Sequence, residues 1–118
     1  MGRYKPELEE RILLAAHWDT RPYADRDSVN KDKAIDGAND GASGVGVLLE
    51  IARILSQNDA PIGVDIIFFD AEDYGAISND GSFFDVQSMN DTWCLGSQYW
   101  AKNMPIKNYK PKYGILLD

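Results

Sequence analysis

The chain has 118 residues, of which 44% are hydrophobic and 26% charged, and this composition is ordinary for one globular domain with a modest core. A formal net charge of −7 argues against a nucleic-acid partner, because phosphate contacts need clustered Lys and Arg residues that this sequence lacks. No apolar run is long enough to span a bilayer, and the single cysteine, Cys94, allows neither an internal disulfide nor a thiolate metal site. Any metal must therefore be held by carboxylates and imidazole.

The first half of the chain predicts a strand, a long loop and a helix. Residues Arg11–Ala16 form a short apolar run of strand length that His17 closes. The polar stretch Thr20–Asn39 predicts a loop, and loops of that length in compact domains are usually functional or disordered. A helix is expected over Ser43–Gln57, with Ser43 as its N-cap and with one apolar face formed by Leu48, Ile51, Ala52 and Leu55.

The second half continues the alternation of strands and helices. Residues Gly63–Phe69 form a nearly unbroken apolar run, which is typical of a strand buried on both faces. A polar insertion, Tyr74–Asp91, comes before a helix expected over Leu95–Asn103, and Tyr113–Leu117 predicts another buried strand. This order predicts a three-layer α/β/α sandwich with a mostly parallel mixed sheet. Because the chain stops on Asp118 directly after a strand, we expect residues 1–118 to be the N-terminal part of a single, larger catalytic domain.

Acidic and imidazole side chains occur where the predicted strands stop or a helix begins. In an open α/β sheet, the residues that follow parallel strands converge on one edge, even when they are far apart in sequence. Carboxylates crowded there repel one another unless a cation neutralises them. The sequence therefore predicts a divalent metal site formed from His17, Asp19, Asp40, Glu72, Asp73 and Asp118.

Each of these motifs also has a plain structural interpretation. A histidine at a strand end is more often a hydrogen-bonded structural residue, and the small residues around Asp40 are also typical of a turn before a helix. The adjacent acids Glu72 and Asp73 could be a solvated loop pair. We favour a metal ligand beside a general base, because nothing basic lies nearby in sequence to relieve their repulsion.

Five segments in the same order resemble the glutaminyl-peptide cyclotransferase (glutaminyl cyclase) branch of the zinc aminopeptidase-like superfamily. These segments are Leu13–Asp19, Gly37–Val45, Ile66–Asp73, Leu95–Ala101 and Leu116–Asp118. The spacing between the acid pair and the next helix distinguishes the branches. In aminopeptidases of the superfamily, the Gly-Ser sequence that begins this helix usually comes within a few residues of the acid pair. Here about twenty residues intervene, which is similar to the cyclases.

The resemblance implies roles for the site residues, each by its position in these segments. Asp40 and Asp73 would be zinc ligands, and Glu72 would be the general acid/base. Asp118 would tune Glu72 if one zinc is bound, or would ligate a second zinc. His17 would support the ligands in the one-zinc case and would be a ligand in the two-zinc case. Asp19 would also occupy a supporting position beside the metal.

The activity implied by the resemblance converts an N-terminal glutamine of a peptide or protein into pyroglutamate, with release of ammonia. A zinc aminopeptidase that releases N-terminal amino acids, or a non-catalytic domain that retains the fold, are the alternatives. The family's remaining zinc ligand is a downstream histidine, whereas this chain has only His17, so we expect the isolated segment to be inactive. The family tends to work outside the cytosol, which implies an extracytoplasmic (periplasmic or secreted) location.

Overall fold

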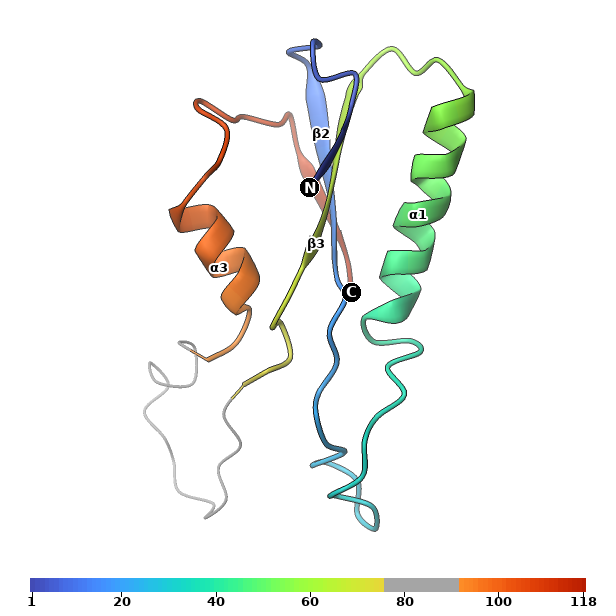
Figure 1. Cartoon of the computed structure of the whole chain (residues 1–118), viewed down its shortest axis with the longest axis vertical. Helices are drawn as coiled ribbons and strands as arrows, with labels where there is room; N and C mark the ends of the chain where they lie inside the picture. The colour runs from blue at the N-terminus through green and yellow to red at the C-terminus, as the bar shows by residue number, and fades with distance from the viewer. Residues whose placement is uncertain (76–91) are drawn as a thin grey trace.

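The computed structural model describes residues 1–75 and 92–118, which form a four-stranded sheet with a helix on each face (Figure 1). The strands are β1 (Gly2–Tyr4), β2 (Arg11–His17), β3 (Gly63–Phe69) and β4 (Gly114–Leu117), in the spatial order β1-β3-β2-β4. Helix α1 (Ala42–Gln57) covers one face and α3 (Leu95–Lys102) the other. The predicted three-layer α/β/α architecture is confirmed.

The pairing of the strands determines which chain segments meet at the sheet edge. Strand β2 pairs in parallel with both β3 and β4, and in the first pairing His17 lies opposite Phe69. In the second, Ala16 lies opposite Leu117. The residues that follow β2, β3 and β4 therefore emerge together at the carboxyl ends of these strands. Strand β1, which pairs antiparallel with β3, was not predicted, because three residues are too few to show an alternating pattern.

The core lies between α1 and the sheet. Leu14, Ala16, Leu48 and Val64 are its buried members, and Ile51 and Leu55 of α1 pack against them while remaining partly exposed. Ala52, which was expected on the same apolar face of the helix, is exposed. Its position at the margin of the apolar stripe leaves its small side chain on the wall of a surface hollow rather than in the core.

Two local predictions are wrong. Helix α1 is capped by Gly41 without a side-chain hydrogen bond, whereas the Ser43 hydroxyl, from inside the first turn, donates to the Asn39 carbonyl. Strand β4 is not buried, since Ile115 is 45% and Leu116 61% exposed. It lies at an edge of the sheet and pairs only with β2 among the described strands, so its apolar side chains have no cover there.

A buried ion cluster ties one end of the sheet to the loop after α3. Asp65 of β3 is fully buried and accepts hydrogen bonds from the Arg11 guanidinium at 2.6 and 2.8 Å and from Arg3 Nε at 3.0 Å. The Tyr109 hydroxyl donates a further bond to Asp65 at 2.7 Å. A carboxylate inside a predicted buried strand is therefore stabilised by partners that come from three other segments.

Most of the predicted insertion Tyr74–Asp91 lies outside the described residues. Over the ranges that are described, neither helix has the length and apolar character needed to cross a bilayer.

Candidate metal centre

The site forms where three parallel strands end and where α1 begins. His17 is the last residue of β2, Glu72 and Asp73 follow β3, and Asp118 follows β4. Asp40 reaches the same place from the loop before α1. The convergence predicted from the sequence is confirmed, because the register of the sheet brings these ends to one edge.

Carboxylates surround the imidazole of His17, which is only 2% exposed. Its Nε2 atom lies 3.0 Å from Asp40 Oδ1 and 3.4 Å from Asp118 Oδ1. Its Nδ1 atom lies 3.7 Å from Asp19 Oδ1 and 4.0 Å from Glu72 Oε2. Every acid proposed for the site, apart from Asp73, is thus within 4.0 Å of this one ring.

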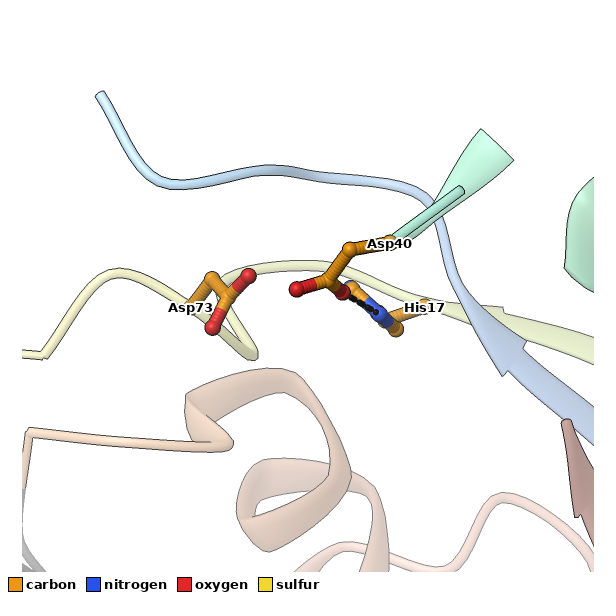
Figure 2. A group of neighbouring side chains, drawn as sticks. All are labelled: His17, Asp40 and Asp73. Atoms are coloured by element: carbon orange, nitrogen blue, oxygen red, sulfur yellow. Dashed lines mark ion pairs between the residues drawn. The ribbon is translucent and has the colours of Figure 1, made fainter. Parts of the chain in front are cut away.

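Three side chains offer ligand atoms to a common point. One nitrogen of His17 and one carboxylate oxygen each of Asp40 and Asp73 all lie within 4.8 Å of one another. Figure 2 shows the three side chains together, with Asp40 paired to His17. Ligands about 2 Å from a shared zinc ion lie at most about 4 Å apart, so small movements of these side chains would let them share one ion.

The bonding of these atoms fits a divalent cation. Both ring nitrogens of His17 and Asp73 Oδ2 are buried and have no hydrogen-bond partner among the described residues, since the approach of Asp40 to Nε2 lacks hydrogen-bond geometry. Leaving such a group unsatisfied costs about 1–3 kcal/mol. Imidazole nitrogen and carboxylate oxygen are zinc ligands, so the residues present fit a divalent metal.

The electrostatics of the cluster lead to the same conclusion. Burial, reinforced by repulsion from Asp40 and Glu72, raises the pKa of Asp73 to about 6. Burial alone would lower the pKa of His17, but the attraction of the neighbouring carboxylates outweighs it and the net pKa is raised. The raised pKa values mean that protons partly neutralise the crowded carboxylates. A bound divalent cation would neutralise more of this negative charge.

The side chain of Asp19 holds the backbone of Glu72 and Asp73. The Asp19 carboxylate accepts the Glu72 N–H at one oxygen and the Asp73 N–H at the other, both at 3.0 Å. The preceding residue, Ala71, has a φ of 53°, a left-handed conformation that is uncommon for a residue with a Cβ atom. The two bonds hold the loop after β3 in this strained turn and direct Glu72 and Asp73 toward His17.

Gly41 allows the loop before α1 to approach the end of β2. Its φ is 93°, and a Cβ atom added there would lie 2.5 Å from the Asp19 carbonyl oxygen and 3.5 Å from His17 Cε1. Only glycine fits both the backbone angle and the space. The adjacent Asp40 reaches His17 as a result of this approach.

Two residues of the site were not predicted from the sequence. Cys94 Sγ lies 3.3 Å from Glu72 Oε1, and a lone cysteine in a sequence gives no sign of such a contact. Arg21 bonds both oxygens of Asp25, stacks over the Trp93 ring at 4.9 Å, and interacts electrostatically with Asp73 and Asp40. No basic residue lies near the acid pair in sequence, but the long polar loop brings Arg21 to it in the fold.

The chain is similar to known proteins along its whole length. The sequence pattern described as peptidase family M28 matches residues 1–118. The glutaminyl cyclase of Tannerella forsythia is 55% identical, with a TM-score of 0.86, over 99% of this chain and 39% of that one. A glutaminyl cyclase of Bacteroides thetaiotaomicron, solved with N-acetylhistamine bound, is 54% identical with a TM-score of 0.85, over the same shares.

A protein with another name is equally similar. The leucine aminopeptidase precursor of Bacteroides thetaiotaomicron VPI-5482 is 54% identical over 99% of this chain and 40% of that one, with a TM-score of 0.86. The chain thus spans about two fifths of the length of each of these three structures.

Proposed function

This chain belongs to peptidase family M28, and from that premise we propose that the whole protein is a zinc-dependent glutaminyl-peptide cyclotransferase. Its substrates would be peptides or proteins that begin with glutamine, and its products pyroglutamate and ammonia. The observation that carries the proposal is the cluster of His17, Asp40 and Asp73, in which His17 and Asp73 are buried and Asp40 is exposed, with Glu72 beside it. The similarity to glutaminyl cyclases, which extends over 99% of the chain, supports the same choice.

The proposed zinc ligands in this chain are Asp40 and Asp73. When bound, the zinc would polarise the γ-carbonyl of the N-terminal glutamine. In a one-zinc site, His17 supports these ligands and Asp118 tunes Glu72. In a two-zinc site, both His17 and Asp118 become ligands, and the 3.4 Å between His17 Nε2 and Asp118 Oδ1 is consistent with such a role.

Glu72 is the proposed proton carrier. The α-amine of the substrate forms a C–N bond to its own γ-carbonyl carbon, and the bond to the side-chain nitrogen breaks. Glu72 takes the proton from the attacking amine and delivers it to the leaving ammonia, so that no proton is gained or lost overall. Its side chain is 29% exposed, whereas Asp73 is buried, so Glu72 is the acid of the pair that a substrate can reach.

An aminopeptidase is the second candidate, and the leucine aminopeptidase precursor at 54% identity favours it. In that reaction, Glu72 would take a proton from water rather than from the substrate amine. A non-catalytic domain that retains the fold is a third candidate from a different class.

The products separate these three functions. The whole protein, loaded with zinc, is incubated with a peptide that begins with glutamine and, as a control, with the same peptide beginning with alanine. Ammonia from the glutamine peptide alone is expected. A free amino acid from either peptide would indicate the peptidase instead, and no product from either would indicate a binding domain. Glu72→Gln provides the background for both assays.

We also propose an extracytoplasmic site of action, which rests on the resemblance alone. Fractionation of the source cells, with the protein detected by antibody, tests it; recovery with cytosolic markers would reject it.

A further inference from the structure

Cys94, at the start of α3, contacts Glu72 in two ways. Its Sγ atom lies 3.3 Å from Glu72 Oε1, and its backbone N–H donates to the Glu72 carbonyl at 3.0 Å. Cys94 occupies the N-cap position of the helix in a left-handed conformation, with a φ of 54°. A single residue therefore contacts both the backbone and the carboxylate of the proposed proton carrier.

Two further backbone hydrogen bonds join the start of α3 to the loop after β3. After the Cys94 N–H, the next two amides of the helix start, those of Leu95 and Gly96, donate to the carbonyls of Ala71 and Asp70 at 2.9 and 3.0 Å. The first amides of a helix have no partner within the helix, so the loop after β3 satisfies them here. A Cβ atom on Gly96 would collide with the Asp70 carbonyl, which shows how closely the two segments approach.

The thiol is suited to donate rather than to react. Burial, together with the hydrogen bond to Glu72, raises the pKa of Cys94 to about 11, so at neutral pH the sulfur keeps its proton. A protonated thiol is a weak donor and a poor nucleophile. The opposite oxygen of the carboxylate, Glu72 Oε2, faces His17 Nδ1 at 4.0 Å. The two Glu72 oxygens thus have different neighbours.

We propose that Cys94 is a positioning residue, whose S–H donates to Glu72 Oε1 and holds this carboxylate in the orientation from which it transfers protons. The inference rests on the function proposed above for Glu72. A glutamate side chain has three rotatable bonds, and an oxygen tethered at one side leaves fewer orientations for the other. Cys94 itself would touch neither substrate nor zinc.

Kinetics of the whole protein with a Gln-initiated peptide test the role of the thiol. We expect Cys94→Ala to lower kcat about tenfold and to leave KM within about twofold, because the bond orients a reacting group without binding substrate. Cys94→Ser keeps a donor and should retain kcat within about threefold of the wild type. Ser97→Ala is the matched control, since the Ser97 hydroxyl bonds the Cys94 carbonyl in the same turn. An unchanged kcat in Cys94→Ala, or an equal loss in Cys94→Ser, would reject the positioning role.

Infrared spectroscopy tests the hydrogen bond without any activity. The spectrum of the wild type minus that of Cys94→Ser isolates the S–H stretch of this residue. The band is expected below the frequency of an unbonded thiol and should move up when the acceptor is removed by Glu72→Ala. Identical bands in the wild type and Glu72→Ala would overturn the proposal. A shifted band in a protein that releases no ammonia would instead refute the cyclase function while the contact stands.

Discussion

At the scale of single residues, the two adjacent acids after β3 differ in their surroundings. Asp73 is buried with one oxygen unpartnered, whereas Glu72 is partly exposed and bonded to Cys94. In the whole protein we expect Glu72→Gln to keep its zinc and to lose roughly 10²–10⁴-fold in kcat, the usual share of general acid/base catalysis. Asp73→Ala should lose the zinc itself. Metal analysis of the purified variants, alongside ammonia release, measures both.

The opposite pattern would exchange the two roles. If Glu72→Gln strips the metal while Asp73→Ala retains it, Glu72 is the ligand. Full activity in both variants would remove the acid pair from the mechanism.

Asp19 acts on both acids through their amides rather than through the metal. In Asp19→Asn, one of the two acceptor oxygens becomes an NH₂ group, so only one of the N–H groups of Glu72 and Asp73 keeps its partner. We expect a loss of about 1 kcal/mol in the free energy of unfolding, because a partly buried donor loses its partner, and a lower zinc affinity. Urea unfolding and zinc titration measure the two effects. Wild-type values for both would show that the strained turn at Ala71 holds by itself.

At the scale of elements, the start of α1 depends on one glycine. Gly41→Ala would place a Cβ atom 2.5 Å from the Asp19 carbonyl, in a left-handed backbone. We expect a loss of about 1–3 kcal/mol in the free energy of unfolding, measured by urea denaturation of the whole protein.

Gly46, in the interior of α1, is the matched control. A Cβ atom added there meets nothing within 4 Å, so Gly46→Ala should stabilise the helix by about 0.5–1 kcal/mol. Equal effects of the two substitutions would show that the close approach at Gly41 is not needed.

The elements that were predicted correctly are those with strong local patterns. Strands β2 and β3 and helices α1 and α3 lie within about one residue of the expected bounds, because apolar periodicity and turn residues define them locally. The wrong predictions, the burial of β4 and the N-cap of α1, concern features that local patterns do not define. Exposure of β4 depends on what packs beside it, and the cap of α1 depends on a backbone angle at Gly41 that the residue types alone did not reveal.

At the scale of the whole molecule, the convergence of the acids was predictable because parallel topology fixes it. The contacts around Asp65 were not, since Arg11 and Asp65 are 54 residues apart and no spacing rule joins them. The same holds for Cys94 and Glu72, which are 22 residues apart and separated by residues outside the described ranges. Long-range polar pairs carry no periodic signal in one sequence.

The Asp65 cluster makes stability depend on pH. Burial would raise the pKa of Asp65, but hydrogen bonds from Arg11, Tyr109 and Arg3 hold it below its ordinary value of 3.8. A lowered pKa stabilises the fold above about pH 4, and this contribution is lost as the pH falls further. We expect Asp65→Asn to destabilise the whole protein by about 3 kcal/mol at neutral pH, with the difference shrinking below pH 4.

Urea unfolding of the wild type and Asp65→Asn between neutral pH and pH 3 measures this difference. A gap between the two proteins that stays constant across the range would show that Asp65 does not titrate as proposed.

The parallel pairing of β2 with β3 also has a consequence for folding. His17 and Asp73 come from segments that this register aligns, with His17 opposite Phe69. A slip of one residue would turn the side chains of β2 to the opposite face, and His17 would leave the cluster. The cluster of His17, Asp40 and Asp73 therefore forms only in the correctly aligned sheet. Metal uptake during refolding should report the arrival of the native alignment, and a misaligned sheet, however compact, would remain without its ion.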